Sequence, residues 1–325
     1  MLVLGIAVAK ATLVVVLLSG ERQQPAEVAN TPAGHAKLQS WLTKRSPEPL
    51  HACLEATGTY GDDLAQALVD AGHTVSIVNP ARIAAYAKVQ AARHKTDQAD
   101  AALSARFCQR DQPAAWQPPA PELRELRALV RHLDTLQQQR QAEHNRLEAG
   151  GHPRAVRQAI QAHLTFLTEQ IATVEQQIEE HFEQHPNLKR QRELRDSIKG
   201  IAVRTATRLL AELGDWQRVA NARAVVAYVG LNPREYRSGS SVQRRTRLST
   251  SGNPAVRAAL YFPAIVAKQH TPLVQALCAR LTARALCPKA VVGAAMRKLL
   301  TLAYGVLKSG QPCDPKYAQA ASGQA

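Results

Sequence analysis

Cysteine is scarce in this chain of 325 residues. The five cysteines are an odd number, and no two of them form a Cys-x-x-Cys pair. These absences exclude a disulfide framework and a zinc site built on paired cysteines, and they indicate a reducing compartment. The cysteines are Cys53, Cys108, Cys278, Cys287 and Cys313.

The chain also lacks a recognisable secretion signal. Residues 1–18 are apolar, but no basic segment precedes them and Lys10 interrupts them. They are rich in Val and Leu and fit two buried strands better. No other apolar run approaches the length that spans a bilayer. We therefore expect a cytoplasmic protein without a membrane partner.

Acidic residues are also fewer than basic ones. Lys and Arg number 41 and Asp and Glu number 26, so the net charge is 41 − 26 = +15. The segment 189–257 holds 15 basic and five acidic residues, which is +10 of that charge. We expect a polyanion, usually nucleic acid, against the C-terminal half. The alternative is a basic protein that is merely soluble, or one that binds ribosomes or membranes.

The first 110 residues carry an α/β pattern. Their apolar periodicity predicts strand, strand, helix, strand, helix, strand, helix, helix, and hence a mixed sheet. The RNase H-like fold has this order of elements, as do other small α/β folds. A segment with four prolines, 111–121, then forms a linker. The predicted strands are 2–8, 12–18, 50–54 and 74–78, and the predicted helices begin at Pro32 and cover 62–71, 81–89 and 96–108.

Two long helices follow the linker, separated by Gly150, Gly151 and Pro153. Their apolar residues alternate three and four apart, which predicts an antiparallel coiled-coil hairpin or a dimerising arm. Two helices of an ordinary bundle are an equal alternative. The seam residues are Leu126, Leu129, Leu133 and Leu136 in the first helix, and Leu164, Leu167, Ile171, Val174 and Ile178 in the second.

The last part of the chain, from Pro186, is mainly helical. Its Ile198-Lys199-Gly200-Ile201 turn is typical of helix-hairpin-helix modules, which present backbone N–H groups to a DNA phosphate. Alternatively, the glycine only caps the preceding helix. We expect a polar, basic loop at 234–252, a helix of about fifteen residues after Asn253-Pro254, and a long helix at 290–309.

Three carboxylates are candidates for a metal site. Glu55 ends a predicted strand, and Asp97 and Asp100 share one face of a helix. Phosphodiester chemistry uses Mg²⁺ or Mn²⁺ held by such carboxylates. Taken singly, Asp97 could complement the helix dipole and Asp100 could be solvated surface. Taken together, the three favour a metal site.

Ser238 is the candidate nucleophile. A serine hydroxyl can attack a phosphodiester and hold the broken end as a phosphoserine. The neighbouring arginines are candidates for phosphate contacts. On the residues alone, a loop that only binds phosphates is the favoured interpretation. The candidate nucleic-acid contacts are Arg237, Arg244, Arg245, Arg247 and Lys199.

Four motifs then occur in one order along essentially the whole chain, and they resemble those of the IS110 (IS-one-ten) family of insertion-sequence transposases, the bridge-RNA-guided serine recombinases. The motifs are Ile6-x-Val8-Ala9-Lys10, Glu55-Ala56-Thr57-Gly58-Thr59-Tyr60, Lys95-Thr96-Asp97-x-x-Asp100-Ala101 and Tyr236-x-Ser238-Gly239-Ser240-Ser241, the last preceded by Gly230-Leu231-x-Pro233.

The resemblance implies a fold in three parts. These are a RuvC-like (RNase H-like) metal-binding domain at 1–118, a coiled-coil hairpin at 119–186 and a mainly helical transposase domain at 187–325. Glu55, Asp97 and Asp100 match three of the family's four Asp-Glu-Asp-Asp carboxylates, and Ser238 matches its nucleophile.

The resemblance also implies partners. These are target and donor DNA, a structured bridge RNA that pairs with both, and further copies of the chain in a dimer or tetramer. In such an assembly the carboxylates of one subunit serve the serine of another. The protein would then act at the bacterial nucleoid.

The sequence departs from the family at Ala7, where the family has Asp. We interpret this as an engineered inactivation or a natural loss that weakens metal binding and cleavage. Ala7 therefore favours two rival readings, a non-catalytic nucleic-acid-binding protein or a RuvC-like nuclease remnant. Ordinary water-mediated nuclease activity would form no protein–DNA adduct and would not need Ser238.

Overall fold

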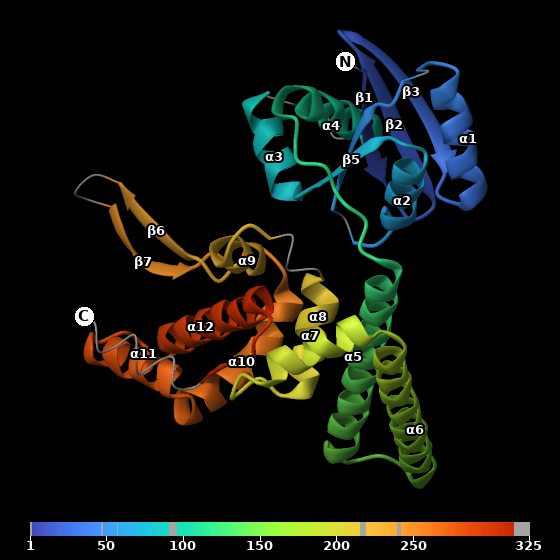
Figure 1. Ribbon diagram of the computed structural model, residues 1–325. Coiled ribbons are helices and arrows are strands. Elements are labelled where there is room, and N and C mark those ends of the chain that lie inside the picture. Colours follow the sequence, from blue (N-terminus) through green and yellow to red (C-terminus); the bar gives the residue numbers. More distant parts are fainter. Residues whose placement is uncertain are drawn as a thin grey trace. The chain divides into compact units, whose positions relative to one another are not determined.

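The computed structural model describes residues 2–46, 48–56, 58–90, 96–214, 219–238 and 242–314, with the backbone alone at 237–238 and 242–245. The chain divides into two compact units, Met1–Pro118 and Pro119–Ala325. Figure 1 traces the helices and strands of both.

The first unit is built on a five-stranded sheet with the order β3-β2-β1-β4-β5. The first three strands run antiparallel, whereas β4 and β5 run parallel to β1. This mixed sheet is consistent with the expected RNase H-like domain. The strands are β1 Leu2–Val8, β2 Thr12–Ser19, β3 Arg22–Ala29, β4 His51–Glu55 and β5 Thr74–Val78.

No strand is expected at 22–29 from the sequence, and that expectation is wrong. β3 pairs with β2 along its whole length, from Thr12 opposite Ala29 to Ser19 opposite Arg22. It lies at the edge of the sheet, is mostly exposed and contains a proline. Edge strands tolerate polar residues and proline, so β3 carries little of the apolar signal that marks a buried strand.

Helices cover both faces of this sheet (Figure 1). Leucines of α1 and α2 share a core with Leu4, Ile6 and Leu54 on one face. Residues of α3 and α4 pack on the other face with Val3 and Cys53. The helices are α1 Pro32–Thr43, α2 Asp62–Asp70, α3 Pro80–Val89 and α4 Asp97–Asp111.

The proline-rich segment after α4 is bound to the first unit. Trp116 N–H donates a hydrogen bond of 2.6 Å to the Val75 carbonyl. The Ser76 hydroxyl lies 2.9 Å from the carbonyls of both Pro113 and Ala114. The predicted linker therefore runs along β5 for part of its length.

In the part of the second unit that the structure describes, the elements are helices and a single hairpin of two strands. The expected leucine seam joins α5 and α6, which lie side by side (Figure 1). The same core includes Leu188 of α7 and Leu210 of α8, so the long hairpin and the following helices share one interior. The elements are α5 Pro121–Glu148, α6 Arg154–Gln184, α7 Pro186–Asp196, α8 Val203–Leu213, α9 Ala222–Val229, β6 Pro233–Ser238, β7 Val242–Leu248, α10 Pro254–His270, α11 Pro272–Ala283 and α12 Pro288–Ser309.

Among the described helices, α12 alone is long and apolar enough to cross a membrane by length and composition. The expectation that no second run approaches that length was therefore wrong. Packing explains its apolar character, because Val291, Leu299, Leu300 and Ala303 lie in the core of the second unit.

Residues 234–252 were expected to be a loop, and this too was wrong. Most of them form β6 and β7, an antiparallel pair with Pro233 opposite Leu248 and Ser238 opposite Val242. Residues 234–236 and 246–247 are exposed. A half-buried strand is predicted from its alternating apolar and polar residues. An exposed ribbon lacks this alternation, so its sequence does not predict a strand.

Candidate functional site

The carboxyl ends of β1 and β4 lie next to each other. The two strands are parallel, with Ile6 opposite Leu54, so the next pair along is Ala7 and Glu55. Ile6 and Leu54 face the core under α1 and α2, whereas Cys53 faces α3 and α4. Because side chains alternate along a strand, Ala7 and Glu55 point to the face that carries α4.

The first turn of α4 lies close to the same strand ends. Asp97 and Asp100 are in that turn, and Ala7 packs against the cluster that contains Ala101. Gly5 makes this approach possible, because a Cβ at residue 5 would lie 1.9 Å from the Ala101 carbonyl oxygen. Any larger residue at position 5 would push α4 away from β1.

These residues have the donor chemistry for a divalent cation. Mg²⁺ and Mn²⁺ prefer carboxylate oxygens, which Glu55, Asp97 and Asp100 would supply, while Ala7 supplies none. Within the described part of the chain, no three His, Cys, Asp or Glu side chains are grouped closely enough to hold a metal. That Glu55, Asp97 and Asp100 bind a metal ion therefore stays a prediction.

Asn30 ties the loop after Glu55 to the ends of other strands. Its Nδ2 donates to the carbonyls of Ala9, at 3.0 Å, and Tyr60, at 2.9 Å. Its Oδ1 lies 3.0 Å from His35 Nε2, and burial lowers the pKa of His35. Sequence reasoning missed Asn30, because a single Asn after an unrecognised strand carries no pattern.

Ser238 is the last residue of β6, and β7 begins at Val242. The side chains of Ser238, Arg237, Arg244 and Arg245 lie outside the described part of the structure, as do all of Thr57, Lys95, Gly239, Ser240 and Ser241. The backbone register places Arg237 opposite Gln243 and Tyr236 opposite Arg244. The nucleophile and these arginines therefore stay predictions.

Two arginines oppose each other on this ribbon. Arg234 pairs directly with Arg247, and both are exposed. Like charges directly opposite on neighbouring strands are destabilising. An anion between or beside them would remove that repulsion, and a two-stranded ribbon is narrow enough for the major groove of DNA.

The end of the hairpin at Leu248 packs against the helices of the second unit. Leu248 packs on α12, with its Cδ1 3.0 Å from where a Cβ of Gly293 would lie. Thr250 N–H donates to the Gly230 carbonyl at 3.1 Å, and Asn253 N–H donates to the Tyr228 carbonyl at 3.0 Å. The ribbon therefore projects from a fixed base.

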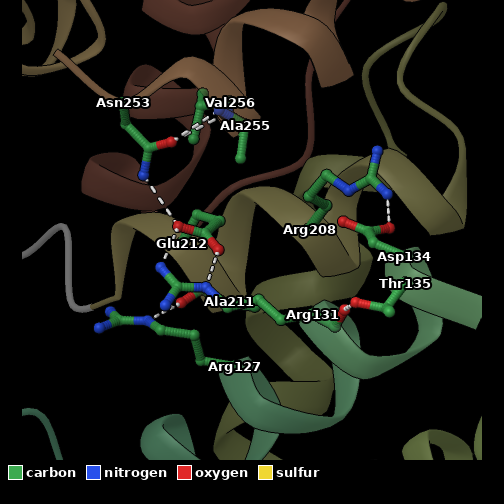
Figure 2. A network of polar contacts seen from close by, with 10 residues as sticks. All are labelled: Arg127, Arg131, Asp134, Thr135, Arg208, Ala211, Glu212, Asn253, Ala255 and Val256. Atoms are coloured by element: carbon green, nitrogen blue, oxygen red, sulfur yellow. Dashed lines mark hydrogen bonds and ion pairs between the residues drawn. The ribbon is translucent and has the colours of Figure 1, made fainter. Parts of the chain in front are cut away.

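A buried carboxylate extends this attachment (Figure 2). Glu212 of α8 is 4% exposed and accepts two hydrogen bonds from Arg131, from Nε at 2.7 Å and Nη2 at 3.0 Å. It also accepts one of 2.9 Å from Asn253 Nδ2. The Asn253 Oδ1 in turn accepts from the N–H groups of Ala255 and Val256 at the start of α10.

The environment of Glu212 sets its charge. Burial alone would raise the pKa of its carboxyl, but hydrogen bonds from Arg131 and Asn253, with the positive charge of Arg131, lower that pKa below its usual value. Glu212 therefore stays ionised and fastens α5 and α10 to α8. The sequence marked Asn253 as a helix cap but gave no sign of Glu212.

The Lys199 turn packs inward as well as facing solvent. The Thr271 hydroxyl donates to the Lys199 carbonyl at 2.6 Å. Gly200, with φ of +107°, lies against Ala267 of α10. Both the backbone conformation of the turn and the close packing therefore require glycine at position 200. Lys199 is exposed, and its contact with nucleic acid stays a prediction.

Comparison with known proteins places both units in one family. Residues 4–150 match the family model of IS110-type transposases with a DEDD motif. Residues 192–279 match the model described as the transposase IS116/IS110/IS902 family. The chain is 31% identical to pilin gene-inverting proteins of Moraxella bovis and Moraxella lacunata, over 96% of its own length and 98% of theirs. The chain belongs to the IS110 family of transposases.

Proposed function

We propose that this protein is an RNA-guided DNA recombinase that cuts and rejoins DNA through Ser238 with the help of divalent metal. One observation carries the proposal. The carboxyl ends of the parallel strands β1 and β4 are neighbours, and Ala7 packs against the first turns of α4, the helix that carries Asp97 and Asp100. The four carboxylates that the family implies would have to gather at these strand ends, and position 7 carries an alanine in place of one of them.

Glu55, Asp97 and Asp100 would hold the metal. Bound Mg²⁺ or Mn²⁺ neutralises the charge that develops on a phosphate during substitution. With Ala7 the site has one ligand fewer than the four implied by the family, so this chain should bind metal weakly and cleave poorly.

Ser238 would carry out the exchange. Its Oγ attacks the scissile phosphorus, the bond from phosphorus to the leaving sugar oxygen breaks, and the serine proton ends on that oxygen. A free hydroxyl of another strand then attacks the phosphoserine and regenerates Ser238. Arg237, Arg244, Arg245 and Arg247 would bind the phosphates near the serine, and Lys199 would bind one further away.

The substrates would be a target and a donor DNA, each paired with one structured bridge RNA. The relatives in Moraxella are named for inverting a pilin gene, and a serine exchange of two strand pairs on one molecule would produce such an inversion. A dimer or tetramer would bring the carboxylates of one subunit to the serine of another.

A second candidate is a non-catalytic protein that binds nucleic acid. Ala7 is the observation that favours it, because a missing carboxylate would remove cleavage without disturbing the sheet.

A cleavage assay separates the two candidates. End-labelled target and donor DNA, the candidate RNA and Mg²⁺ are incubated with the chain as given, with Ala7→Asp, and with Ala7→Asp plus Ser238→Ala. We expect a slowly migrating protein–DNA adduct on a denaturing gel with Ala7→Asp alone. Binding without an adduct from any of the three proteins would support the non-catalytic candidate.

A further inference from the structure

The helix α10 is apolar on two sides. Its inner side, which includes Leu260 and Ala264, is buried in the core of the second unit. Its outer side exposes Tyr261 at 44%, Phe262 at 73% and Val266 at 45%. Exposed aromatic and aliphatic side chains in one stripe mark a binding surface.

The stretch of sequence that contains this stripe has no acidic residue. Between Glu235 and Asp314 there is no Asp or Glu. The same segment holds twelve basic residues: Arg237, Arg244, Arg245, Arg247, Arg257, Lys268, Arg280, Arg284, Lys289, Arg297, Lys298 and Lys308. A surface from this segment is therefore suited to a polyanion.

The helical period gives the order of the side chains across the outer face of α10. Successive residues are rotated by about 100°, so Arg257 and Lys268 fall on one edge and Tyr261 lies next to them. Lys268 is exposed, whereas Arg257 is half-buried and donates from one Nη to the Val229 carbonyl at 2.8 Å. Phe262 follows, and Val266 lies at the opposite edge. Arg257 and Lys268 are about 16 Å apart along the axis at about 1.5 Å per residue, which is the length of two or three nucleotides of an extended strand.

The opposite edge borders a cavity of about 540 Å³ between α5, α6, α8 and α10. Ala259, one turn before Phe262, contributes to its wall. Asp134 and Glu175 also line it, ion-paired with Arg208 and Arg204. A strand on α10 would keep its phosphates on the edge that carries Arg257 and Lys268 and turn its bases toward the aromatic rings.

We infer that this face, Arg257, Tyr261, Phe262, Val266 and Lys268, binds an unpaired strand of DNA by stacking its bases on the aromatic rings. DNA is the substrate of the family, and bases present their flat faces only when they are unpaired. A second copy of α10 is a poorer occupant, because helices without any acidic residue repel each other. The inference concerns binding alone and does not depend on Ser238 or on residue 7.

The test measures the affinity of the full chain for labelled oligo-dT by fluorescence anisotropy, with a hairpin duplex and oligo-rU as further probes. Phe262→Ala should weaken oligo-dT binding by roughly 5- to 100-fold, the effect of losing one stacked base. Phe262→Trp should keep the affinity. Phe166→Ala is the matched control, because Phe166 is a 52% exposed aromatic on α6, and it should have no effect.

Four results would overturn the inference. They are an unchanged affinity of Phe262→Ala for oligo-dT, an equal loss for the duplex, a greater loss for oligo-rU than for oligo-dT, and an altered mass in sedimentation, which would assign the face to a protein interface. Because Phe262 is exposed, the thermal unfolding of the variant should match that of the parent, which checks that the loss is not caused by misfolding.

Discussion

At the scale of single residues, we predict that position 7 decides how the first unit responds to metal. Ala7→Asp would place a fourth carboxylate beside Glu55 at the strand ends. Without metal the added charge repels its neighbours, so the melting temperature should fall or stay the same. With Mg²⁺ at about 100 times its Kd, binding adds about 2.7 kcal/mol to the free energy of unfolding.

Thermal unfolding with and without Mg²⁺ measures this effect. Ala11→Asp adds the same charge at an exposed position near the β1–β2 turn and should gain little from Mg²⁺. Equal gains for the two variants would mean that residue 7 is not at a metal site.

Glu212 gives a second prediction at this scale. Its lowered pKa means that its ionised form stabilises the fold at neutral pH, and this stabilisation is lost as pH falls through the folded-state pKa. Glu212→Gln should lower the free energy of unfolding by about 1–3 kcal/mol at pH 7, and the difference should shrink below about pH 4.

Denaturant unfolding at several pH values checks this, with Glu179→Gln as the control. Glu179 is 55% exposed and pairs with Arg192, so its loss should lower the free energy of unfolding by less than about 1 kcal/mol. A difference between parent and Glu212→Gln that stays constant down to pH 3 would contradict the assigned role of the charge.

At the scale of elements, the contact of α4 with β1 positions two of the candidate ligands. Gly5→Ala would place a Cβ 1.9 Å from the Ala101 carbonyl oxygen, so α4 must move. We expect the free energy of unfolding to fall by about 1–3 kcal/mol, and in the Ala7→Asp background we expect a loss of Mg²⁺ stabilisation.

Gly305→Ala is the opposite case, because nothing lies within 4 Å of the added Cβ in helix α12. It should raise the free energy of unfolding by up to about 1 kcal/mol. If Gly5→Ala were as well tolerated as Gly305→Ala, the close packing of α4 on β1 would be refuted.

The hairpin of β6 and β7 gives the fourth prediction. Arg247→Glu replaces a repulsive pair with an attractive one opposite Arg234, so the fold should be as stable or gain about 0.2–1 kcal/mol. DNA affinity should fall, and the dependence of log affinity on log salt should become shallower by about one unit per lost phosphate contact.

Arg284→Glu makes the same charge change at an exposed position on the second unit. If both substitutions alter the salt dependence of DNA affinity equally, the hairpin attracts DNA only through the overall positive charge of the protein.

Whether an element could be predicted from the sequence depended on how it is buried. Strands β1, β2, β4 and β5 and helices α1 and α4 were predictable, because burial leaves a local apolar pattern along each of them. The edge strand β3, the exposed hairpin β6–β7 and the short helix α11 were missed, because their stability comes from pairing or from neighbours distant in sequence. Glu212 was missed for the same reason, since its partners are 81 and 41 residues away.

At the scale of the whole molecule, the predicted chemistry is divided between two units. Ala7, Glu55, Asp97 and Asp100 belong to the first unit, and Ser238 belongs to the second. The proposed mechanism therefore requires that both units, from one chain or from two, act on the same phosphate. A change at residue 7 in the first unit must then control a covalent bond formed in the second.

Mass mapping of the DNA-bound protein measures this most directly. Ala7→Asp and the chain as given are each incubated with target, donor, RNA and Mg²⁺, digested with nuclease and protease, and searched for nucleotide-modified peptides. We expect a nucleotide on Ser238 with Ala7→Asp, and little or none with the chain as given. Modification at Ser240 or Ser241, equal modification of Ser238 in both proteins, or no modified serine in either would contradict it.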